Sequence, residues 1–201
     1  SPLATRPRDL LLPRPVRTLP PSFYKKTTHW VARRLIGCVL RHGKTAGIIV
    51  ETEAYTGEDD PGSHAYRGRK TRNAPMFGPA GRAYVYQCHI WPLLNVVTER
   101  EGTPGAVLIR ALIPTEGLAI MRKRRKTEKD RDLTRGPGRL TQALGITLRD
   151  NRKDLRGPGL RIVKGPKGFK CRIARTTRIG LKGPAAKLPW RYHAANCPFV
   201  S

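Results

Sequence analysis

The chain has 201 residues, and its 40 Lys and Arg residues against 14 Asp and Glu give a formal net charge of +26 at pH 7. This length suits one domain with its own core, and a hydrophobic content of 38% excludes a largely disordered protein. The positive charge favours a polyanionic partner. Nucleic acid is preferred to an anionic membrane, because no apolar stretch is long enough to span a bilayer. A bias in amino-acid composition is the alternative explanation of the charge.

The first 21 residues are rich in proline and arginine, and they predict a flexible basic arm before one folded domain at residues 22–201. Ser22 is the expected N-cap of a helix at residues 23–37, which Gly37 would end. The four cysteines lack zinc-site spacing and follow no secretory segment, which indicates reduced thiols. We therefore expect the cytoplasm or nucleoid if the source is bacterial, and the nucleus if it is eukaryotic.

The remaining segments alternate short strands with a few helices. Strands are expected at residues 38–42, 45–55, 82–88, 94–99, 104–113, 160–165 and 170–175 and near residues 190–201, and helices at residues 114–126 and 136–146. The first two strands predict a hairpin. A long loop rich in Gly and Pro, residues 56–81, indicates a functional segment. The pattern predicts an α+β fold: a single domain with a mostly antiparallel, barrel-like β core and peripheral helices.

The stretch IIVETEAYTG, residues 48–57, places two acids in an apolar strand of a very basic chain. Strand side chains alternate between faces, so Glu51, Glu53 and Tyr55 should share one face with Ile49. The other face would carry Ile48, Val50, Thr52 and Ala54. A solvated strand face, or simple pairing with arginines, would explain the acids equally well.

Neighbouring residues favour a pocket over a solvated face. Arg110 lies within the apolar strand AVLIRALI, where a guanidinium needs a buried carboxylate or a phosphate. His64 follows Tyr55 in the long loop, and Tyr84 and Tyr86 share one face of their strand. Aromatic rings and a histidine around a carboxylate indicate a stacking pocket more than a metal site, although each residue could separately belong to the core.

Several of these motifs together resemble the alkyladenine (3-methyladenine) DNA glycosylase family. The resemblance runs from about Pro21 to the end of the chain, and it is specific in combination rather than in any single piece. The segments that carry it are GIIVETEAYTGEDDPGSHAYRGRKTRNAPMF, GRAYVY, LNVVTE, GAVLIRALIPTEGL, GPGRLTQALGI, TTRIGL, LPWRYH and PFVS. It implies a barrel-like single domain that excises alkylated or deaminated purines (3-methyladenine, 7-methylguanine, hypoxanthine, ethenoadenine) from double-stranded DNA, without a metal or other cofactor and as a monomer.

The resemblance also implies roles for residues that match the family motifs. Glu53 resembles the base that activates the hydrolytic water, and Arg110 the arginine that positions this water and contacts the flipped nucleotide. Tyr55 and His64 resemble one wall of the base pocket, and Tyr86 resembles the opposing wall. Asn95 resembles the pocket asparagine that discriminates against the amino group of guanine. Glu51 is expected to support the others. Arg69, Lys70 and Arg139 are expected to contact the DNA backbone.

One segment, QCHIWPLL at residues 87–94, departs from the family pattern. In the family a tyrosine acts as a wedge: it fills the space that the flipped base leaves in the duplex. Simple counting places this residue at His89, whereas a gap in the sequence match moves it to Ile90 or Trp91. His89 and Trp91 are our candidates. Pro92 speaks against a regular strand at this point. A remodelled loop without a wedge is the alternative.

Three other functions compete with a glycosylase that uses water. The charge alone would suit a basic nucleic-acid-binding protein without catalysis. Glu58, Asp59 and Asp60 next to Glu51 and Glu53 could instead hold Mg²⁺ in a nuclease, although GEDDPG is also an ordinary acidic turn. A lysine nucleophile with lyase activity is the third; we predict water as the nucleophile.

Overall fold

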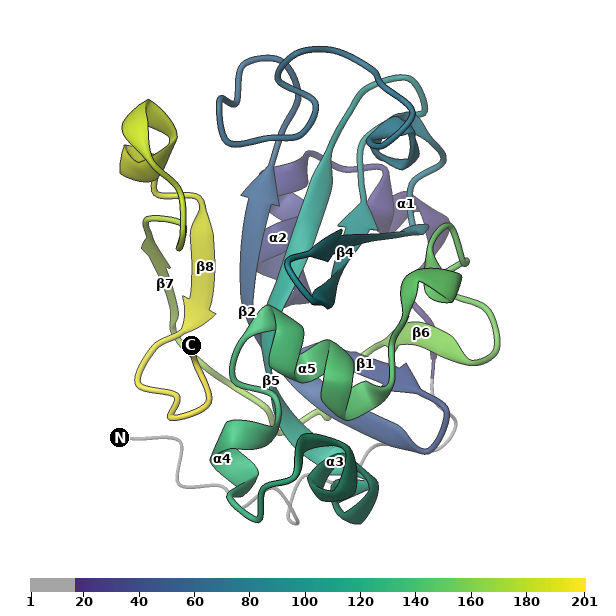
Figure 1. Ribbon diagram of the computed structural model, residues 1–201, viewed down its shortest axis with the longest axis vertical. Helices are drawn as coiled ribbons and strands as arrows, with labels where there is room; N and C mark the ends of the chain where they lie inside the picture. Colours follow the sequence, from purple (N-terminus) through teal and green to yellow (C-terminus); the bar gives the residue numbers. More distant parts are fainter. Residues whose placement is uncertain (1–16) are drawn as a thin grey trace.

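The computed structural model describes residues 17–201 and contains a curled β-sheet with short helices around it (Figure 1). The main path through the eight-stranded sheet is β3-β4-β5-β2-β1-β6, while β8 pairs with β2 and with β7. All seven strand pairings are antiparallel. The predicted α+β class, with a mostly antiparallel, barrel-like core and peripheral helices, is confirmed.

Two long strands form the centre of the sheet. The strands are β1 (Val39–His42), β2 (Thr45–Tyr55), β3 (Ala83–Cys88), β4 (Trp91–Val97), β5 (Ala106–Glu116), β6 (Leu160–Val163), β7 (Ile173–Thr176) and β8 (Arg191–Ala194). The predicted hairpin is confirmed, with β1 and β2 joined at residues 43–44. One edge of β2 pairs with β5. The other edge is shared, because β1 pairs with residues 45–48 and β8 with residues 51–53.

A β-bulge interrupts β2 between Ile49 and Thr52, where the register with β5 shifts twice. The strict alternation predicted for this stretch is therefore wrong. Ile48 and Val50 pack in one hydrophobic cluster, whereas Ile49 and Ala54 pack together in the larger one. A bulge adds an unpaired residue to one strand and reorients the side chains beyond it, which periodicity alone does not reveal.

The helices are short and lie around the sheet. They are α1 (Pro21–Tyr24), α2 (Thr28–Leu35), α3 (Leu118–Arg125), α4 (Asp130–Leu133) and α5 (Pro137–Leu144), with 3₁₀ turns η2 (Ala74–Phe77), η3 (Leu148–Asp150) and η4 (Gly183–Lys187). The single helix predicted from an N-cap at Ser22 is wrong, because two helices occupy this segment. The second helix begins at Thr28, where the Oε1 atom of the distant Glu99 accepts hydrogen bonds from the Thr28 backbone N–H at 2.5 Å and the Thr28 hydroxyl at 2.9 Å.

The helix predicted at residues 114–126 begins later than expected. Residues 114–116 continue β5, and α3 starts after Gly117, whose φ is +73°. A Cβ on Gly117 would lie 2.4 Å from the carbonyl oxygen of Lys44, so only glycine allows the chain to leave the sheet here. The helix predicted at residues 136–146 is confirmed as α5.

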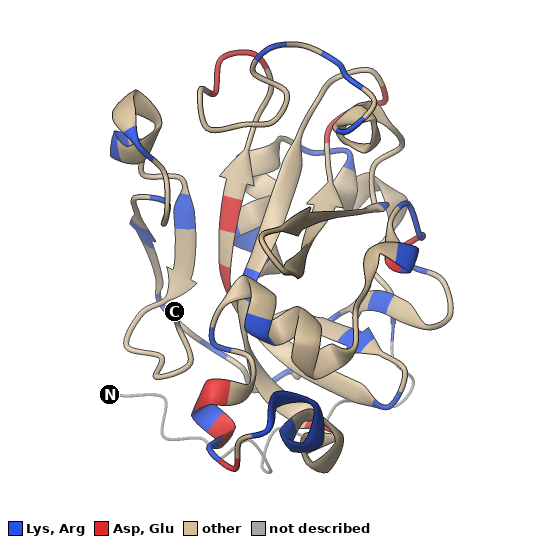
Figure 2. Cartoon of the chain, viewed as in Figure 1, with Lys and Arg blue, Asp and Glu red and all other residues tan. Residues whose placement is uncertain are grey.

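The basic arm predicted for residues 1–21 lies mostly outside the described residues. Its described end packs on the domain: Leu19 is buried, and Thr18 forms a β-bridge with Val163. Within residues 17–201, no helix is both long enough and apolar enough to cross a membrane. Figure 2 shows basic segments over most of the chain, whereas acidic segments gather on a few elements that include β2.

Candidate active site

Two acids and one arginine form a buried charged group at the centre of the sheet. Glu51 and Glu53 on β2 have no exposed surface, and Arg110 on β5 is 7% exposed. The Arg110 guanidinium lies between them, with Nε 3.3 Å from Glu51 Oε1 and Nη1 3.3 Å from Glu53 Oε2. The predicted pairing of this arginine with buried carboxylates is confirmed.

Glu53 is held by donors on both of its oxygens. Oε2 accepts a hydrogen bond from the Tyr55 hydroxyl at 2.8 Å in addition to the contact with Arg110. Oε1 accepts one from the backbone N–H of Ile179 at 2.7 Å. Two carboxylate oxygens offer about four acceptor positions, so this side chain is fixed in direction and still has an acceptor position for a further donor such as water.

Glu51 is engaged by a different set of groups. Its Oε1 accepts a hydrogen bond from Arg191 Nε at 2.7 Å, and its Oε2 accepts one from the backbone N–H of Ser201 at 2.7 Å. Arg110 Nη2 lies 3.4 Å from the Ser201 hydroxyl. Glu51 therefore joins Arg110, β8 and the C-terminal segment, whereas Glu53 faces the aromatic residues.

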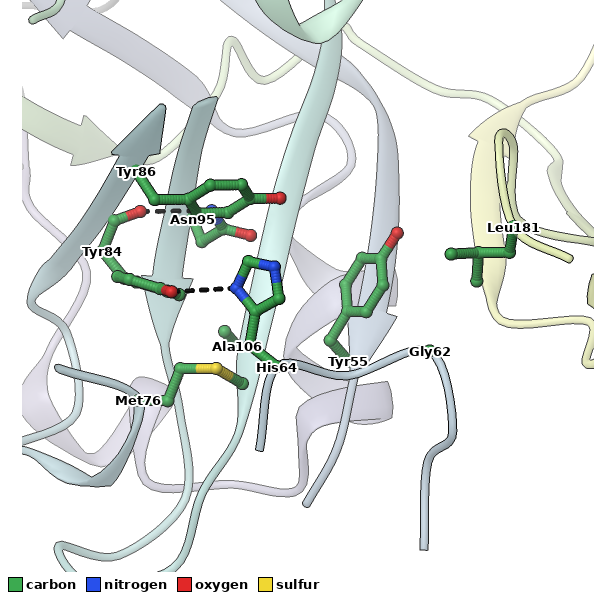
Figure 3. Close-up of a pocket in the computed structure, with 9 residues that line it drawn as sticks. All are labelled: Tyr55, Gly62, His64, Met76, Tyr84, Tyr86, Asn95, Ala106 and Leu181. Atoms are coloured by element: carbon green, nitrogen blue, oxygen red, sulfur yellow. Dashed lines mark hydrogen bonds between the residues drawn. The ribbon is translucent and has the colours of Figure 1, made fainter. Parts of the chain in front are cut away.

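Tyr55, which donates to Glu53, also lines a pocket with a cavity of about 120 Å³ (Figure 3). This cavity has room for a ring system, since a single water needs only about 10–15 Å³ of such space. The lining residues come from β2, the long loop, β3, β4, β5 and the segment after β7: Tyr55, Gly62, His64, Met76, Tyr84, Tyr86, Asn95, Ala106 and Leu181. Figure 3 shows Tyr55 across the pocket from Tyr86 and His64, so the expected grouping of His64 with Tyr55 on one wall is wrong: the His64 ring lies against Tyr86. The structure thus brings together the four residues assigned to the base pocket.

His64 has a fixed position although it lies in the long loop. Its Nδ1 is 2.9 Å from the Tyr84 hydroxyl, and its backbone carbonyl accepts a hydrogen bond from Asn73 Nδ2 at 2.7 Å. Its ring meets that of Tyr86 edge to face, with centroids 4.5 Å apart. The loop that the sequence marked as functional is therefore ordered around the pocket.

The aromatic groups of the pocket carry no charge near neutral pH. Burial raises the pKa of Tyr55 and Tyr86 above the ordinary phenol value, and the Glu53 carboxylate raises that of Tyr55 further. Burial, and then the positive charge of Arg72, lower the pKa of His64. The aromatic walls are neutral rings, and one of them, Tyr55, donates its hydroxyl hydrogen bond to the Glu53 carboxylate.

Asn95 on β4 is 3% exposed and held by the strand next to it. Its Nδ2 donates a hydrogen bond to the carbonyl oxygen of Tyr84 at 3.1 Å. This hydrogen bond to β3 directs the amide, and Asn95 also lines the pocket. This geometry suits the discriminating role that the family resemblance implies.

The divergent segment forms the tip of the β3–β4 hairpin. The expectation that Pro92 prevents a strand is wrong: Pro92 pairs with Gln87 inside β4, beyond the part of β4 that pairs with β5, so the hydrogen bond it cannot donate is not needed there. His89 turns the chain with φ +53°, and Ile90 is 74% exposed. Trp91 packs against α5, where a Cβ on Gly138 would lie 3.0 Å from it.

The three cations assigned to DNA contacts are exposed. Arg69 and Lys70 lie in the long loop, and Arg139 lies in the first turn of α5, 3.6 Å from Asp132. The acidic turn of the same loop is also ordered. Asp60 accepts hydrogen bonds from the backbone N–H groups of Thr56 and Gly62 at 3.2 and 2.9 Å. No group of three or more His, Cys, Asp or Glu residues in the described part of the chain is placed to hold a metal ion.

Sequence reasoning missed the segment after β7. Ile179 donates to Glu53, Leu181 lines the pocket, and Arg178 lies against Tyr55. The motif TTRIGL is part of the family resemblance, but it gave these residues no role. Arg178 and Asp60 form a buried ion pair across 118 residues of sequence, and such a contact leaves no periodic signal.

The comparisons with known proteins agree on one family. The model of that family, described as methylpurine-DNA glycosylase, matches residues 22–198. A protein of Rhodopseudomonas palustris (strain BisB18) is 45% identical over 96% of each chain, and one of Methanoculleus marisnigri is 46% identical over 92% of this chain and 98% of its own. A third, from Bacillus licheniformis, is 45% identical over 91% and 96%. Each bears the name "Putative 3-methyladenine DNA glycosylase".

Proposed function

The chain belongs to the methylpurine-DNA glycosylase family, DNA-repair enzymes that hydrolyse N-glycosyl bonds, and from this premise we propose how it acts on DNA. It flips a modified purine out of the duplex into the pocket between Tyr55, His64 and Tyr86, and Glu53 activates the water that replaces the base. Candidate bases are 3-methyladenine, 7-methylguanine, hypoxanthine and ethenoadenine.

The observation that carries the proposal is the setting of Glu53. It is fully buried, three donors fix its direction, and one of these donors, Tyr55, lines the aromatic cavity, while one acceptor position is left. A water donating to that position would attack C1′ of the flipped nucleotide while its proton passes to Glu53. The C1′–N bond breaks, and the base leaves with the bonding electrons. Positioned general bases contribute about 10²- to 10⁴-fold to such steps.

Selection of the base follows from stacking and from the cost of flipping. A purine methylated on a ring nitrogen, as in 3-methyladenine and 7-methylguanine nucleotides, is cationic, so the faces of neutral tyrosines attract it more than they attract a normal base, by about 0.5–2 kcal/mol. Flipping costs a few kcal/mol and costs least for damaged or mispaired bases. Asn95, held by the carbonyl of Tyr84, would disfavour the amino group of normal guanine, whereas the positive charge of 7-methylguanine strengthens stacking and weakens its glycosidic bond enough to offset this cost.

The hairpin tip supplies the wedge in this scheme. His89 and Trp91 were the candidates from sequence, and the geometry favours the residue between them. Ile90 points its apolar side chain into solvent at the turn, while Trp91 supports the hairpin from α5. Apolar side chains inserted between base steps are a known means of kinking duplex DNA.

The basic surface holds the duplex in place. Arg69 and Lys70 on the long loop and Arg139 on α5 contact phosphates of the DNA backbone. The net charge of +26 attracts the protein to DNA over longer distances. Phosphate contacts carry no sequence information, which suits an enzyme that must search all sequences. One monomer contains the whole pocket, so no second copy is required.

Excision assays on synthetic duplexes test the function. Duplexes carrying one hypoxanthine, 7-methylguanine or ethenoadenine are incubated with excess protein and then cleaved at abasic sites with alkali. We expect cleavage at the modified purine only, full activity in EDTA, and no protein–DNA adduct after borohydride treatment. Tight binding without cleavage of any duplex would favour a non-catalytic binder. Loss of activity in EDTA would favour a nuclease, and a trapped adduct would favour a lysine nucleophile.

A further inference from the structure

Arg178 is a buried arginine directly behind the pocket. Its side chain has no exposed surface, and its two Nη atoms pair with the two oxygens of Asp60 at 2.6 Å each. Nη1 also donates to the carbonyl oxygen of Ala54 at 2.9 Å. A buried ion pair of this kind is weak evidence for stability, because desolvation of the charges offsets their attraction.

The contacts of residues 178 and 179 fall on three consecutive residues of β2. The backbone N–H of Ile179 donates to Glu53, the Arg178 guanidinium donates to the Ala54 carbonyl, and its carbon lies 4.6 Å from the ring centroid of Tyr55. The guanidinium is also 4.9 Å from the ring centroid of Trp190. One side chain therefore touches the strand that carries both the proposed water activator and the proposed base platform.

The same arginine fixes the loop that carries His64. Asp60 lies four residues before His64, and its carboxylate organises the turn through Thr56 and Gly62. Gly62 is needed for this contact, since a Cβ there would lie 2.8 Å from Arg178 Nη2 and 2.8 Å from Leu181. The long loop and the segment after β7 are therefore so close at Gly62 that no side chain fits between them.

We propose that Arg178 is a positioning residue of the glycosylase: with Asp60 it holds the ring of Tyr55, the N–H that directs Glu53 and the loop of His64 in one arrangement. This inference rests on the proposed function. Misplacement of reacting groups by about 1 Å costs about 10²-fold in rate, so the effect of Arg178 appears in excision although it does not touch the base.

Two variants separate positioning from folding. Arg178→Lys keeps the charge, but one ammonium cannot replace two Nη atoms and a planar group against Tyr55. The double variant Arg178→Met/Asp60→Asn removes both buried charges together at similar volume, so neither charge is left buried without its partner. The control is Arg175→Lys, the same substitution at an exposed arginine of β7 that donates to the Pro189 carbonyl and touches no pocket residue.

The experiment measures the single-turnover excision rate on a hypoxanthine duplex, corrected for the active fraction. It also measures the affinity ratio between ethenoadenine-containing and undamaged duplex, and the melting temperature. We expect both Arg178 variants to excise about 10- to 100-fold more slowly and to lose part of the affinity ratio, while the double variant melts close to the parent. Gly62→Ala should reproduce part of the loss.

Rates within threefold of the parent for both Arg178 variants, or losses confined to the active fraction, would overturn the inference. A parent protein that excises no base would instead refute the proposed function. In that case the affinity ratio still decides about Arg178, because it reports the Tyr55 platform without any chemistry.

Discussion

Within the proposed active site, the buried acids of β2 and the tip of the β3–β4 hairpin differ most in how much of their surface is exposed. On β2, Glu51 and Glu53 have no exposed surface and each accepts at least three hydrogen bonds. At the tip, Ile90 is 74% exposed and the turn depends on a residue with positive φ. In the proposed mechanism this difference separates two tasks: the interior fixes the geometry of hydrolysis, and the tip acts on DNA outside the protein.

The largest expected effect is at the water activator. Glu53→Gln keeps the size of the side chain and can still accept hydrogen bonds, but it cannot take a proton from water. We expect the single-turnover excision rate to fall by about 10²- to 10⁴-fold, with DNA binding retained. Rapid-quench assays at saturating protein measure the rate. A fully active variant would remove Glu53 from its role.

A smaller effect is expected at the second buried acid. Glu51→Gln weakens the hold on Arg110 without touching the pocket, so excision should slow by about tenfold and the free energy of unfolding should fall by about 1–3 kcal/mol. The matched control is Glu116→Gln on β5, an acid whose side chain is 39% exposed and paired with Arg41. If Glu51→Gln impairs excision more than Glu53→Gln, the two assignments must be exchanged.

At the hairpin tip we expect a loss that depends on side-chain size. Ile90→Ala should lower excision by about tenfold, because a wedge too small to fill the gap makes base flipping more costly. Ile90→Phe keeps a large apolar side chain at the tip and should therefore excise at about the parental rate. His89→Asn tolerates the positive φ and should behave like the parent protein. An effect at His89 with none at Ile90 would show that the wedge lies where simple counting placed it.

The smallest effect is expected for a residue assigned to contacts with the DNA phosphate backbone. Lys70→Ala should weaken binding to damaged and undamaged duplex alike and reduce the slope of log affinity against log salt by about one. The control is Lys123→Ala, an exposed lysine on α3, which lies at the opposite end of the molecule from the long loop (Figure 1). If the two variants show the same slope of log affinity against log salt, the DNA does not contact the long loop at Lys70.

Local patterns in the sequence predicted several elements and one buried contact, but not the features that depend on residues distant in the sequence. The α+β class, the β1–β2 hairpin and α5 follow from periodicity and turn residues. Arg110 in an apolar strand predicted a buried carboxylate or a phosphate, and it contacts two buried carboxylates. The β-bulge in β2 and the division of the first helix depend on partners far along the chain, Glu99 in the second case. The Arg178–Asp60 pair is hidden from local patterns for the same reason.

The separation of flipping from hydrolysis is the central claim, and fluorescence of an ethenoadenine duplex tests it most directly. The emission of this base changes when it leaves the base stack and enters an aromatic pocket. We predict that Glu53→Gln gives the full fluorescence change of the parent protein without excision, whereas Ile90→Ala gives a smaller change with a proportional loss of excision. A Glu53→Gln variant that loses the fluorescence change, or that still releases the base at the parental rate, would contradict the account.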